Sequence, residues 1–285
     1  MTRSTSLKPL RLALALALAI SAVFVLAACG DSDDEESDQK LSVTLSGETF
    51  QAPGGAEAGS AEISFKNNSD KTADMQFIRV EGDHSPKEVI QALGEVMNGK
   101  PFEDWMFAGG GVAVVKPGES KTVDQVLSPG TYYLFNTESD GPPDPSATAS
   151  FEVSGDESDT ELEADATVTA EDADKEYSFT ADNVSSGNTE ILFDNEGEQP
   201  HHLLLAPIKG DATVEDIETA FKEEKGPPPI EEKGSESTAV IEGGEAQLVT
   251  LKLEPGRYAM FCFITDRKGG KPHALKGMVD EVEVE

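Results

Sequence analysis

Residues 254–264 read Glu-Pro-Gly-Arg-Tyr-Ala-Met-Phe-Cys-Phe-Ile, and the start of this stretch has a counterpart earlier in the chain. Ser128-Pro-Gly-Thr-Tyr132 matches Glu254-Pro-Gly-Arg-Tyr258 at an offset of 126 residues. Further upstream, Phe65-Lys-Asn67 matches Phe193-Asp-Asn195 at an offset of 128. A nearly constant offset over a whole domain indicates an internal repeat with one small deletion. The chain therefore contains two copies of one domain.

Short apolar runs lie at or beside these matched positions in both copies. They are rich in β-branched and aromatic residues and are bounded by Gly, Pro and Asn; examples are residues 61–65, 190–193, 250–253 and 258–264. Such runs are typical of the strands of a β-sandwich. The sequence thus predicts a mainly β protein made of two tandem sandwiches.

One short helix is expected within each copy. In the first copy Ser85 is the N-cap, Pro86 the first helical residue and Glu88 the capping-box partner. In the second copy Asp211 or Thr213 is the cap. The apolar stripes that follow at helical spacing are Val89, Ile90, Leu93 and Val96 in the first copy, and Val214, Ile217, Ala220 and Phe221 in the second.

Residues 1–28 are typical of an export signal. A region with three cations and no acid precedes the apolar residues 12–28. A membrane span is the alternative, since these 17 residues are near the lower limit for crossing a bilayer. Leu26-Ala-Ala-Cys29-Gly30 resembles a bacterial lipobox. That resemblance implies acylation of Cys29, which would anchor the protein to a bacterial cell membrane on its extracytoplasmic side.

Acidic residues dominate the composition. Asp and Glu number 55 against 22 Lys and Arg, a net charge of −33 at pH 7, which would repel nucleic acids and argues against binding them. Acidic runs predict two extended segments. We expect a signal peptide at 1–28, an acidic tether at 29–40, a first domain at 41–154, an acidic linker at 155–166 and a second domain at 167–285.

Residues that can bind a metal are concentrated in the second copy. His201 and His202 stand at the start of a strand, Cys262 at the end of another, and His273 and Met278 follow. One thiolate, two imidazoles and one thioether form a soft set of ligands that suits copper. Two His and one Cys with a weak axial Met are the ligands of blue-copper electron-transfer sites.

The segments around these residues resemble the cupredoxins, the family of plastocyanin, azurin and halocyanin. Three features carry the resemblance: the approach to the first histidine, the strand before the cysteine, and a Gly-Met pair after the second histidine. The matching residues are Asn195, Gly197, Pro200 and His201; Gly256, Tyr258 and Cys262; and His273, Gly277 and Met278.

The resemblance implies two Greek-key cupredoxin-like sandwiches, with one copper ion in the second. His201, Cys262 and His273 would be the equatorial ligands and Met278 the axial one, while His202 is the alternative ligand. The chain departs from the family in one respect, because ten residues separate Cys262 from His273. Such a long loop can fold out as a hairpin and return His273 to the site, or it can loosen the site.

The first copy lacks these ligands. Ala73 and Asp74 stand where the second copy has its two adjacent histidines, and Asn136 stands where it has its cysteine. We therefore expect no copper in the first domain. Its role as a spacer, a docking surface or a lid stays open at this point.

These features together predict an exported, membrane-anchored, monomeric carrier of single electrons, and not a catalyst. The negative charge would steer a basic redox partner such as a cytochrome. His273 would be the electron exit if its ring edge reached solvent, as the resemblance implies. The alternatives are a copper storage or delivery protein and a metal-free binding module. A Cys–His nucleophile pair is a weaker alternative.

Overall fold

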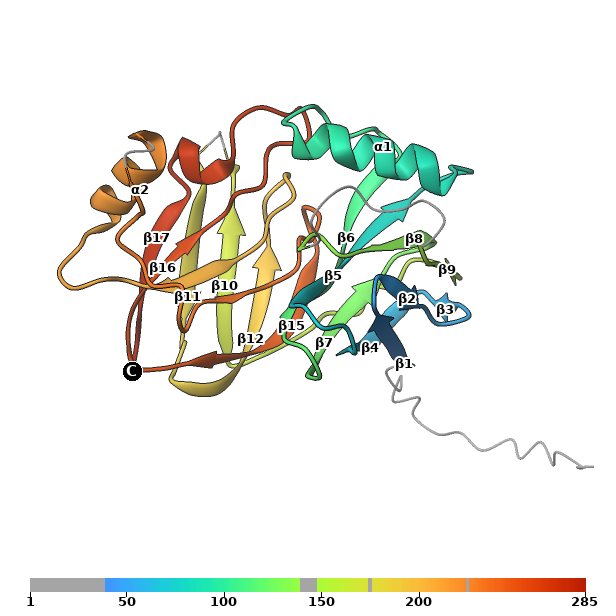
Figure 1. The fold of residues 1–285 in the computed structure, drawn as a ribbon, viewed down its shortest axis with the longest axis horizontal. Coiled ribbons are helices and arrows are strands. Elements are labelled where there is room, and N and C mark those ends of the chain that lie inside the picture. Colours follow the sequence, from blue (N-terminus) through green and yellow to red (C-terminus); the bar gives the residue numbers. More distant parts are fainter. Residues whose placement is uncertain (1–38, 139–147, 174–175, 224–225) are drawn as a thin grey trace, which may run out of the picture. The chain divides into compact units, whose positions relative to one another are not determined.

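The computed structural model describes residues 39–138, 148–173, 176–223 and 226–285 (Figure 1). The expected signal peptide and Cys29 lie outside these residues, as does most of the expected tether.

The first copy folds into two layers of strands. One layer contains β2, β1, β4 and β7, and the other is a five-stranded sheet in the order β3-β9-β8-β5-β6. The bounds are β1 Gln39–Ser46, β2 Thr49–Gln51, β3 Ala56–Glu57, β4 Gly59–Asn67, β5 Ala73–Val80, β6 Met106–Val115, β7 Ser120–Leu127, β8 Gly130–Phe135 and β9 Ser150–Ser154.

The second copy repeats this arrangement. Strands β11, β10, β12 and β15 form one layer, and a four-stranded sheet in the order β14-β13-β16-β17 forms the other. The bounds are β10 Ala166–Glu171, β11 Ser178–Asp182, β12 Gly187–Asn195, β13 Leu204–Pro207, β14 Glu236–Ser237, β15 Ala246–Leu253, β16 Gly256–Phe261 and β17 Val279–Val284.

Equivalent strands begin and end at the offsets found in the sequence. β4 and β12 differ by 128 residues at both ends, and β7 and β15 differ by 126. The first strand of each copy also pairs in parallel with the same partner, β1 with β4 and β10 with β12. The expected fold class, two tandem Greek-key cupredoxin-like β-sandwiches, is therefore confirmed.

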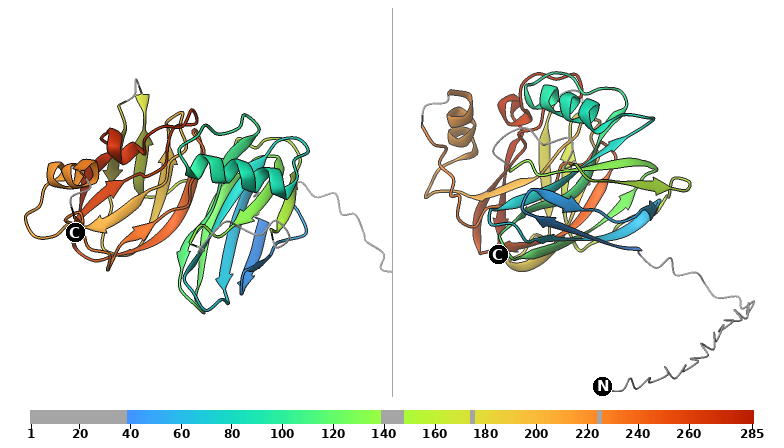
Figure 2. Two further views of the ribbon diagram at one scale, coloured as in Figure 1. Left: turned by 45° about the horizontal axis from the view of Figure 1, so that its top comes forward. Right: turned by 45° about the vertical axis from the view of Figure 1, so that its right-hand side comes forward.

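The two sandwiches share one sheet. β15 pairs with β7 in an antiparallel register that places Gln247 opposite Gln125, so eight strands run continuously through both copies. The Gln247 side chain donates to Gln125 Oε1 at 2.9 Å and to the carbonyl oxygen of Gly111 at 2.7 Å. The described residues of both sandwiches belong to one unit of the chain, and Figure 2 shows the two sandwiches side by side.

The buried faces follow the alternation of the strands. Along β4 every second side chain is fully buried, because successive side chains of a strand point to opposite faces. Phe65 on β4 and its counterpart Phe193 on β12 are both fully buried. Each such burial contributes about 1.5–3 kcal/mol to folding.

Each copy carries one α-helix, α1 (Pro86–Met97) and α2 (Val214–Glu223). Ser85 caps α1 and forms the expected capping box with Glu88. At α2 the cap is Thr213, whose Oγ1 accepts from the Asp216 amide at 3.2 Å. A 3₁₀ helix that the sequence did not predict, η2, covers His273–Lys276. Among the described residues, no helix is long and apolar enough to span a bilayer.

Candidate metal centre

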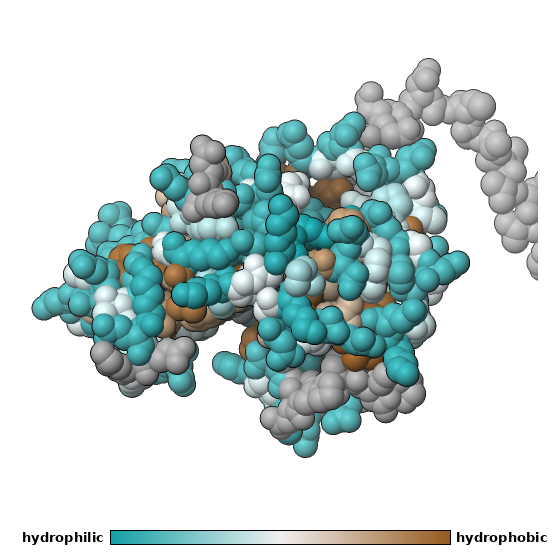
Figure 3. Space-filling view, turned by 90° about the horizontal axis from the view of Figure 1, so that it is seen from above, coloured by the Kyte–Doolittle hydropathy of each residue, from teal (hydrophilic) through white to brown (hydrophobic). Residues whose placement is uncertain are grey.

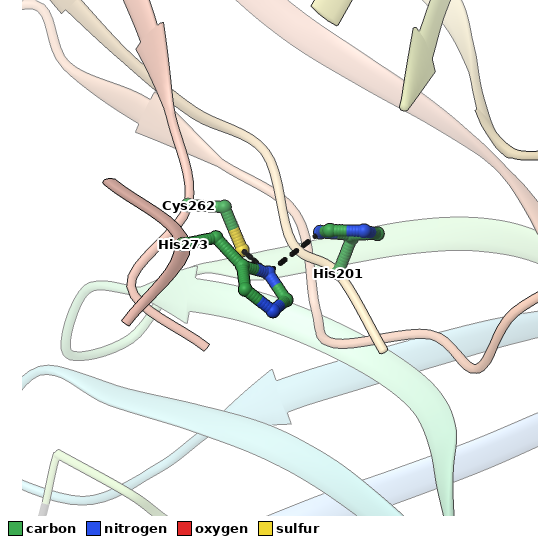
Figure 4. A group of neighbouring side chains, drawn as sticks. All are labelled: His201, Cys262 and His273. Carbon is green, nitrogen blue, oxygen red and sulfur yellow. Dashed lines mark hydrogen bonds between the residues drawn. The ribbon is translucent and has the colours of Figure 1, made fainter. Parts of the chain in front are cut away.

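Three donor side chains from separate segments of the second sandwich meet at one point (Figure 4). His201 precedes β13, Cys262 directly follows β16 and His273 opens η2. One donor atom of each lies within 4.8 Å of the other two. His273 Nδ1 is 3.0 Å from His201 Nδ1 and 3.6 Å from Cys262 Sγ. All three side chains are fully buried.

The segment before His201 is held by a buried asparagine. Asn195, at the end of β12, donates from its side chain to the carbonyl oxygens of Gln199 and Glu242 at 2.9 and 3.0 Å. His201 then exchanges two backbone hydrogen bonds with Ile241, at 3.0 and 2.9 Å. These hydrogen bonds thus fix the backbone at His201 and, with it, the direction of the Cα–Cβ bond of this histidine.

The long loop between the other two donors returns to its starting point. The His273 amide donates to the carbonyl oxygen of Ile264 at 2.9 Å, and the Ala274 amide donates to that of Cys262 at 2.7 Å. The tip turns where Gly269 donates to the carbonyl oxygen of Asp266 at 2.7 Å. Of the two outcomes expected for this loop, the structure has the one that brings His273 back beside Cys262.

Each imidazole is bonded to a carboxylate through its far nitrogen. His201 Nε2 lies 3.2 Å from Asp172 Oδ2, and His273 Nε2 lies 3.0 Å from Asp266 Oδ1. A carboxylate accepts and a neutral imidazole carries one proton, so this network assigns the proton of each ring to Nε2. Both Nδ1 atoms therefore present lone pairs toward the sulfur.

Burial keeps all three donors uncharged in the absence of a metal. It lowers the pKa of His201 and lowers that of His273 to about 3. Burial also raises the pKa of the Cys262 thiol to about 12, although the backbone amides of His202 and Ile264 donate hydrogen bonds to its sulfur. These two amides would stabilise the thiolate that a metal requires.

The donors fit a soft metal ion in both spacing and chemistry. Imidazole nitrogen and thiolate sulfur bind such ions at about 2.0–2.3 Å, which places ligand atoms around one ion roughly 3–4 Å apart. The distances of 3.0 and 3.6 Å lie in this range. Two unprotonated nitrogens at 3.0 Å repel each other, and a cation between them removes that repulsion. Two imidazoles and one thiolate suit copper.

The other two candidate ligands are Met278, which lies in the apolar core, and His202, whose side chain bonds to the backbone. Met278 is fully buried in the same apolar core as Cys262, and its amide donates to the carbonyl oxygen of His273 at 3.1 Å. His202 is not brought into the donor group. Its Nε2 accepts a hydrogen bond from the Phe263 amide at 3.0 Å, so the lone pair of that nitrogen is not free to bind a metal.

The first sandwich keeps this bonding pattern without the metal donors. Asn136, the counterpart of Cys262, accepts through Oδ1 from the amides of Asp74 and Glu138, both at 3.2 Å. These amides are the counterparts of the two that bond to the cysteine sulfur. Asp74 also accepts from the Thr137 amide at 2.6 Å, as His202 accepts from Phe263. The common pattern indicates that His202 and Asp74 brace the backbone in their respective sandwiches.

His273 does not reach the surface. Its side chain is fully buried, Tyr177 stacks on the ring with centroids 4.7 Å apart, and Asp266 bonds to its outer nitrogen. The condition for a solvent-facing electron exit at His273 is therefore not met. The long loop is the physical reason, since it carries Asp266 over the ring edge.

The two aspartates were not recognised from the sequence. Asp172 and Asp266 are two of 55 acidic residues, and no local pattern distinguishes them. One feature of the structure points to Asp172: a Cβ atom on Gly197 would lie 2.4 Å from its Oδ2. A glycine is needed there to admit the carboxylate.

A comparison with protein-family models gives no match, and neither does one with curated proteins. Solved structures do match. Reduced auracyanin from Roseiflexus castenholzii is 17% identical, covers 42% of this chain and 99% of its own, and has a TM-score of 0.31. A multicopper oxidase (14% identical, 87% of this chain, 88% of its own, TM-score 0.23) and the copper nitrite reductase of Nitrosomonas europaea (15%, 87%, 94%, TM-score 0.22) also match.

One expectation from the sequence needs correction here. We expected an electron carrier or metal-binding protein and not a catalyst. Copper enzymes are among the similar structures, and they extend over 87% of this chain. The expectation that the protein is not a catalyst is therefore wrong, because two adjacent sandwiches of this kind also occur in enzymes.

Proposed function

We propose that the protein transfers single electrons through one copper ion, which His201, Cys262, His273 and Met278 would hold. The observation that carries the proposal is the convergence of three buried donor atoms whose histidines are each oriented by a carboxylate. Copper, when bound, supplies a one-electron couple between its Cu(I) and Cu(II) states.

The protein's own residues support rapid electron transfer by keeping the site rigid. Asp172 and Asp266 hold the two rings in one tautomer and one orientation. The amides of His202 and Ile264 hold the sulfur, and Tyr177 closes the site over His273. A site that moves little between oxidation states exchanges electrons with a small reorganisation cost.

Burial also supports this function over copper storage or delivery. Each of the three donor side chains is fully buried, so release of the ion requires the loop to open. This supports retention of copper during turnover. A storage or delivery protein would exchange its copper with a chelator readily and would show no reversible one-electron potential.

The proposal includes an export signal at 1–28 and attachment of the protein outside the cytoplasm through acylated Cys29. Removal of residues 1–28 takes away three cations and no acid, which leaves 19 Lys and Arg against 55 Asp and Glu, a net charge of −36. Hydrophilic side chains cover most of the face that carries α1 and η2 (Figure 3). The net negative charge would attract a basic partner such as a cytochrome. Replacement of Cys29 by Ala should move the protein from the membrane to the soluble fraction, and an unchanged membrane fraction would contradict anchoring.

The central experiment adds Cu(II) to the purified full chain and records its visible spectrum and voltammogram. We expect one tightly held copper per chain, an intense thiolate-to-copper charge-transfer band and a reversible one-electron wave. Cys262→Ser should abolish the band. His84→Gln, which removes a histidine of the first sandwich, should leave it unchanged. A colourless wild-type protein that loses its copper on desalting would overturn the proposal.

A further inference from the structure

The loop that carries Asp266 and leads to His273 is bonded to the first sandwich. The Phe102 amide donates to the carbonyl oxygen of Arg267 at 2.8 Å, and the Gly270 amide donates to that of Gly99 at 3.0 Å. Both partners belong to the segment between α1 and β6, and the ribbon shows the loop running toward the end of α1 (Figure 1).

Gly269 allows this close approach. Its φ is +74°, and a Cβ atom there would lie 2.6 Å from the carbonyl oxygen of Gly99 and 2.8 Å from the carbonyl carbon of Lys100. These are backbone atoms, which cannot move aside as a flexible side chain can. The glycine thus lets the loop pack directly against the backbone of the first sandwich.

Arg267 makes the most extensive contacts across this junction. Its Nη2 donates to the carbonyl oxygens of Met106 at 3.0 Å and Glu103 at 3.4 Å. The guanidinium carbon lies 4.9 Å from the ring centroid of Phe107 and 5.5 Å from that of Phe102. All four partners belong to the first sandwich.

The same guanidinium also reaches the segment behind His201. Its Nη1 bonds to Glu242 Oε2 at 2.8 Å, and that oxygen accepts from the Ala108 amide of β6 at 3.0 Å. Glu242 directly follows Ile241, which is hydrogen-bonded to His201. Arg267 therefore connects the ligand loop, the His201 segment and β6.

We propose that the first sandwich holds the metal-binding loop of the second in place, and that Arg267 is the positioning residue that joins them. The chain of contacts runs from β6 and Phe102 to Arg267, then to the adjacent Asp266, and from its Oδ1 to His273 Nε2. The inference rests on the proposed copper site and gives the sandwich without ligands a role in it.

The test compares Arg267→Gln with Arg257→Gln in the full chain. Arg257 is a matched control, because it pairs with Glu281 and donates to a carbonyl oxygen within the second sandwich. We expect Arg267→Gln to speed the loss of copper to a chelator by about tenfold, the lower end of the affinity loss on removal of a direct partner of a ligand, because Arg267 acts on the ligands through its neighbours. It should also alter the charge-transfer band and the reduction potential. Arg257→Gln should match the wild type.

A measurement on the metal-free protein separates this inference from the proposed function. Hydrogen exchange at the amides of Phe102 and Gly270 reports directly on the two backbone bonds between loop and first sandwich. Arg267→Gln should speed exchange at both, whereas Arg257→Gln should not. A wild type that binds no copper would overturn the copper site, yet this exchange experiment would still decide whether Arg267 holds the loop.

Two further variants cover the case in which Arg267→Gln fails to fold. Arg267→Lys keeps the charge but lacks the planar fork, so copper loss should be faster than in the wild type. Phe107→Leu changes only the first sandwich, and it should speed copper loss about two- to fivefold, because one cation–π contact contributes about 0.5–1 kcal/mol. Wild-type copper loss and amide exchange in all folded Arg267 variants would overturn the proposal.

Discussion

Cys262 is a thiol in the metal-free protein, and its two partners are neutral imidazoles. Burial raises the pKa of the thiol to about 12 and lowers that of His273 to about 3. A metal ion that needs the thiolate must displace one proton from sulfur, whereas Nδ1 of each ring is already free. Metal binding thus requires the loss of only one proton, the one on the Cys262 sulfur.

This assignment predicts the pH dependence of copper binding. Between about pH 6 and 8 each Cu(II) should release one proton, and the binding constant should rise about tenfold per pH unit. Calorimetric titration in buffers of different ionisation enthalpy measures the number of protons. Release of two or more protons would show that an imidazole is protonated in the metal-free site, against the network described above.

At the scale of elements, β6 is shaped by three consecutive glycines. The register between β5 and β6 shifts close to Gln76 and Gly111. Gly111 has a φ of +121°, and a Cβ atom there would lie 2.0 Å from the carbonyl oxygen of Met75. The amide of the preceding glycine, Gly110, donates to the carbonyl oxygen of Val240 at 3.0 Å, beside the segment that supports His201. The irregular strand therefore determines how closely the two sandwiches approach.

Gly111→Ala should lower the free energy of unfolding by about 3 kcal/mol or more, through combined strain and overlap. The matched control is Gly118→Ala, because Gly118 has a φ of +78° with nothing within 4 Å of the added carbon. That control should cost about 1 kcal/mol. Urea denaturation of both variants measures the difference, and equal losses would refute the close approach at Gly111.

At the scale of the whole molecule, the carboxyl group of Glu245 lies partly buried beside the shared sheet. Burial raises the pKa of Glu245 from its ordinary 4.5 to about 7, while the Glu242 amide bonds to it and Arg79 of the first sandwich attracts it. The folded state then holds a proton that the unfolded state loses above pH 4.5. Stability therefore falls as the pH rises from about 4.5 to 7.

Glu245→Gln should remove this loss. Relative to wild type, the variant should gain about 3 kcal/mol of unfolding free energy between pH 4.5 and 7, the equivalent of the pKa difference. Denaturant melts at several pH values give both curves, and their difference isolates Glu245 from other acids whose pKa is raised, such as Asp74. Glu254→Gln, at an exposed position, is the control. Parallel wild-type and Glu245→Gln curves would contradict the assignment.

Local signals in the sequence predicted many of the strands, both α-helices and three side chains that lie together in the structure. The offset between Tyr132 and Tyr258 predicted equivalent strands, Ser85 with Glu88 predicted the start of α1, and the spacing around Cys262 pointed to the three donors that meet in the structure. A cap and a strand pattern can be recognised because each depends on residues close together in the chain, and the repeat can be recognised because the same local pattern occurs twice.

Only the tertiary structure decided what connects these parts. The pairing of β15 with β7, the carboxylates that orient the two histidines, the burial of His273 and the contacts of Arg267 all join residues far apart in the chain or select one acid among many. Edge-to-edge pairing and the direction of a side chain depend on how whole layers pack. The sequence by itself therefore determined which atoms could bind a metal, and packing of the two sandwiches decided how firmly they are held.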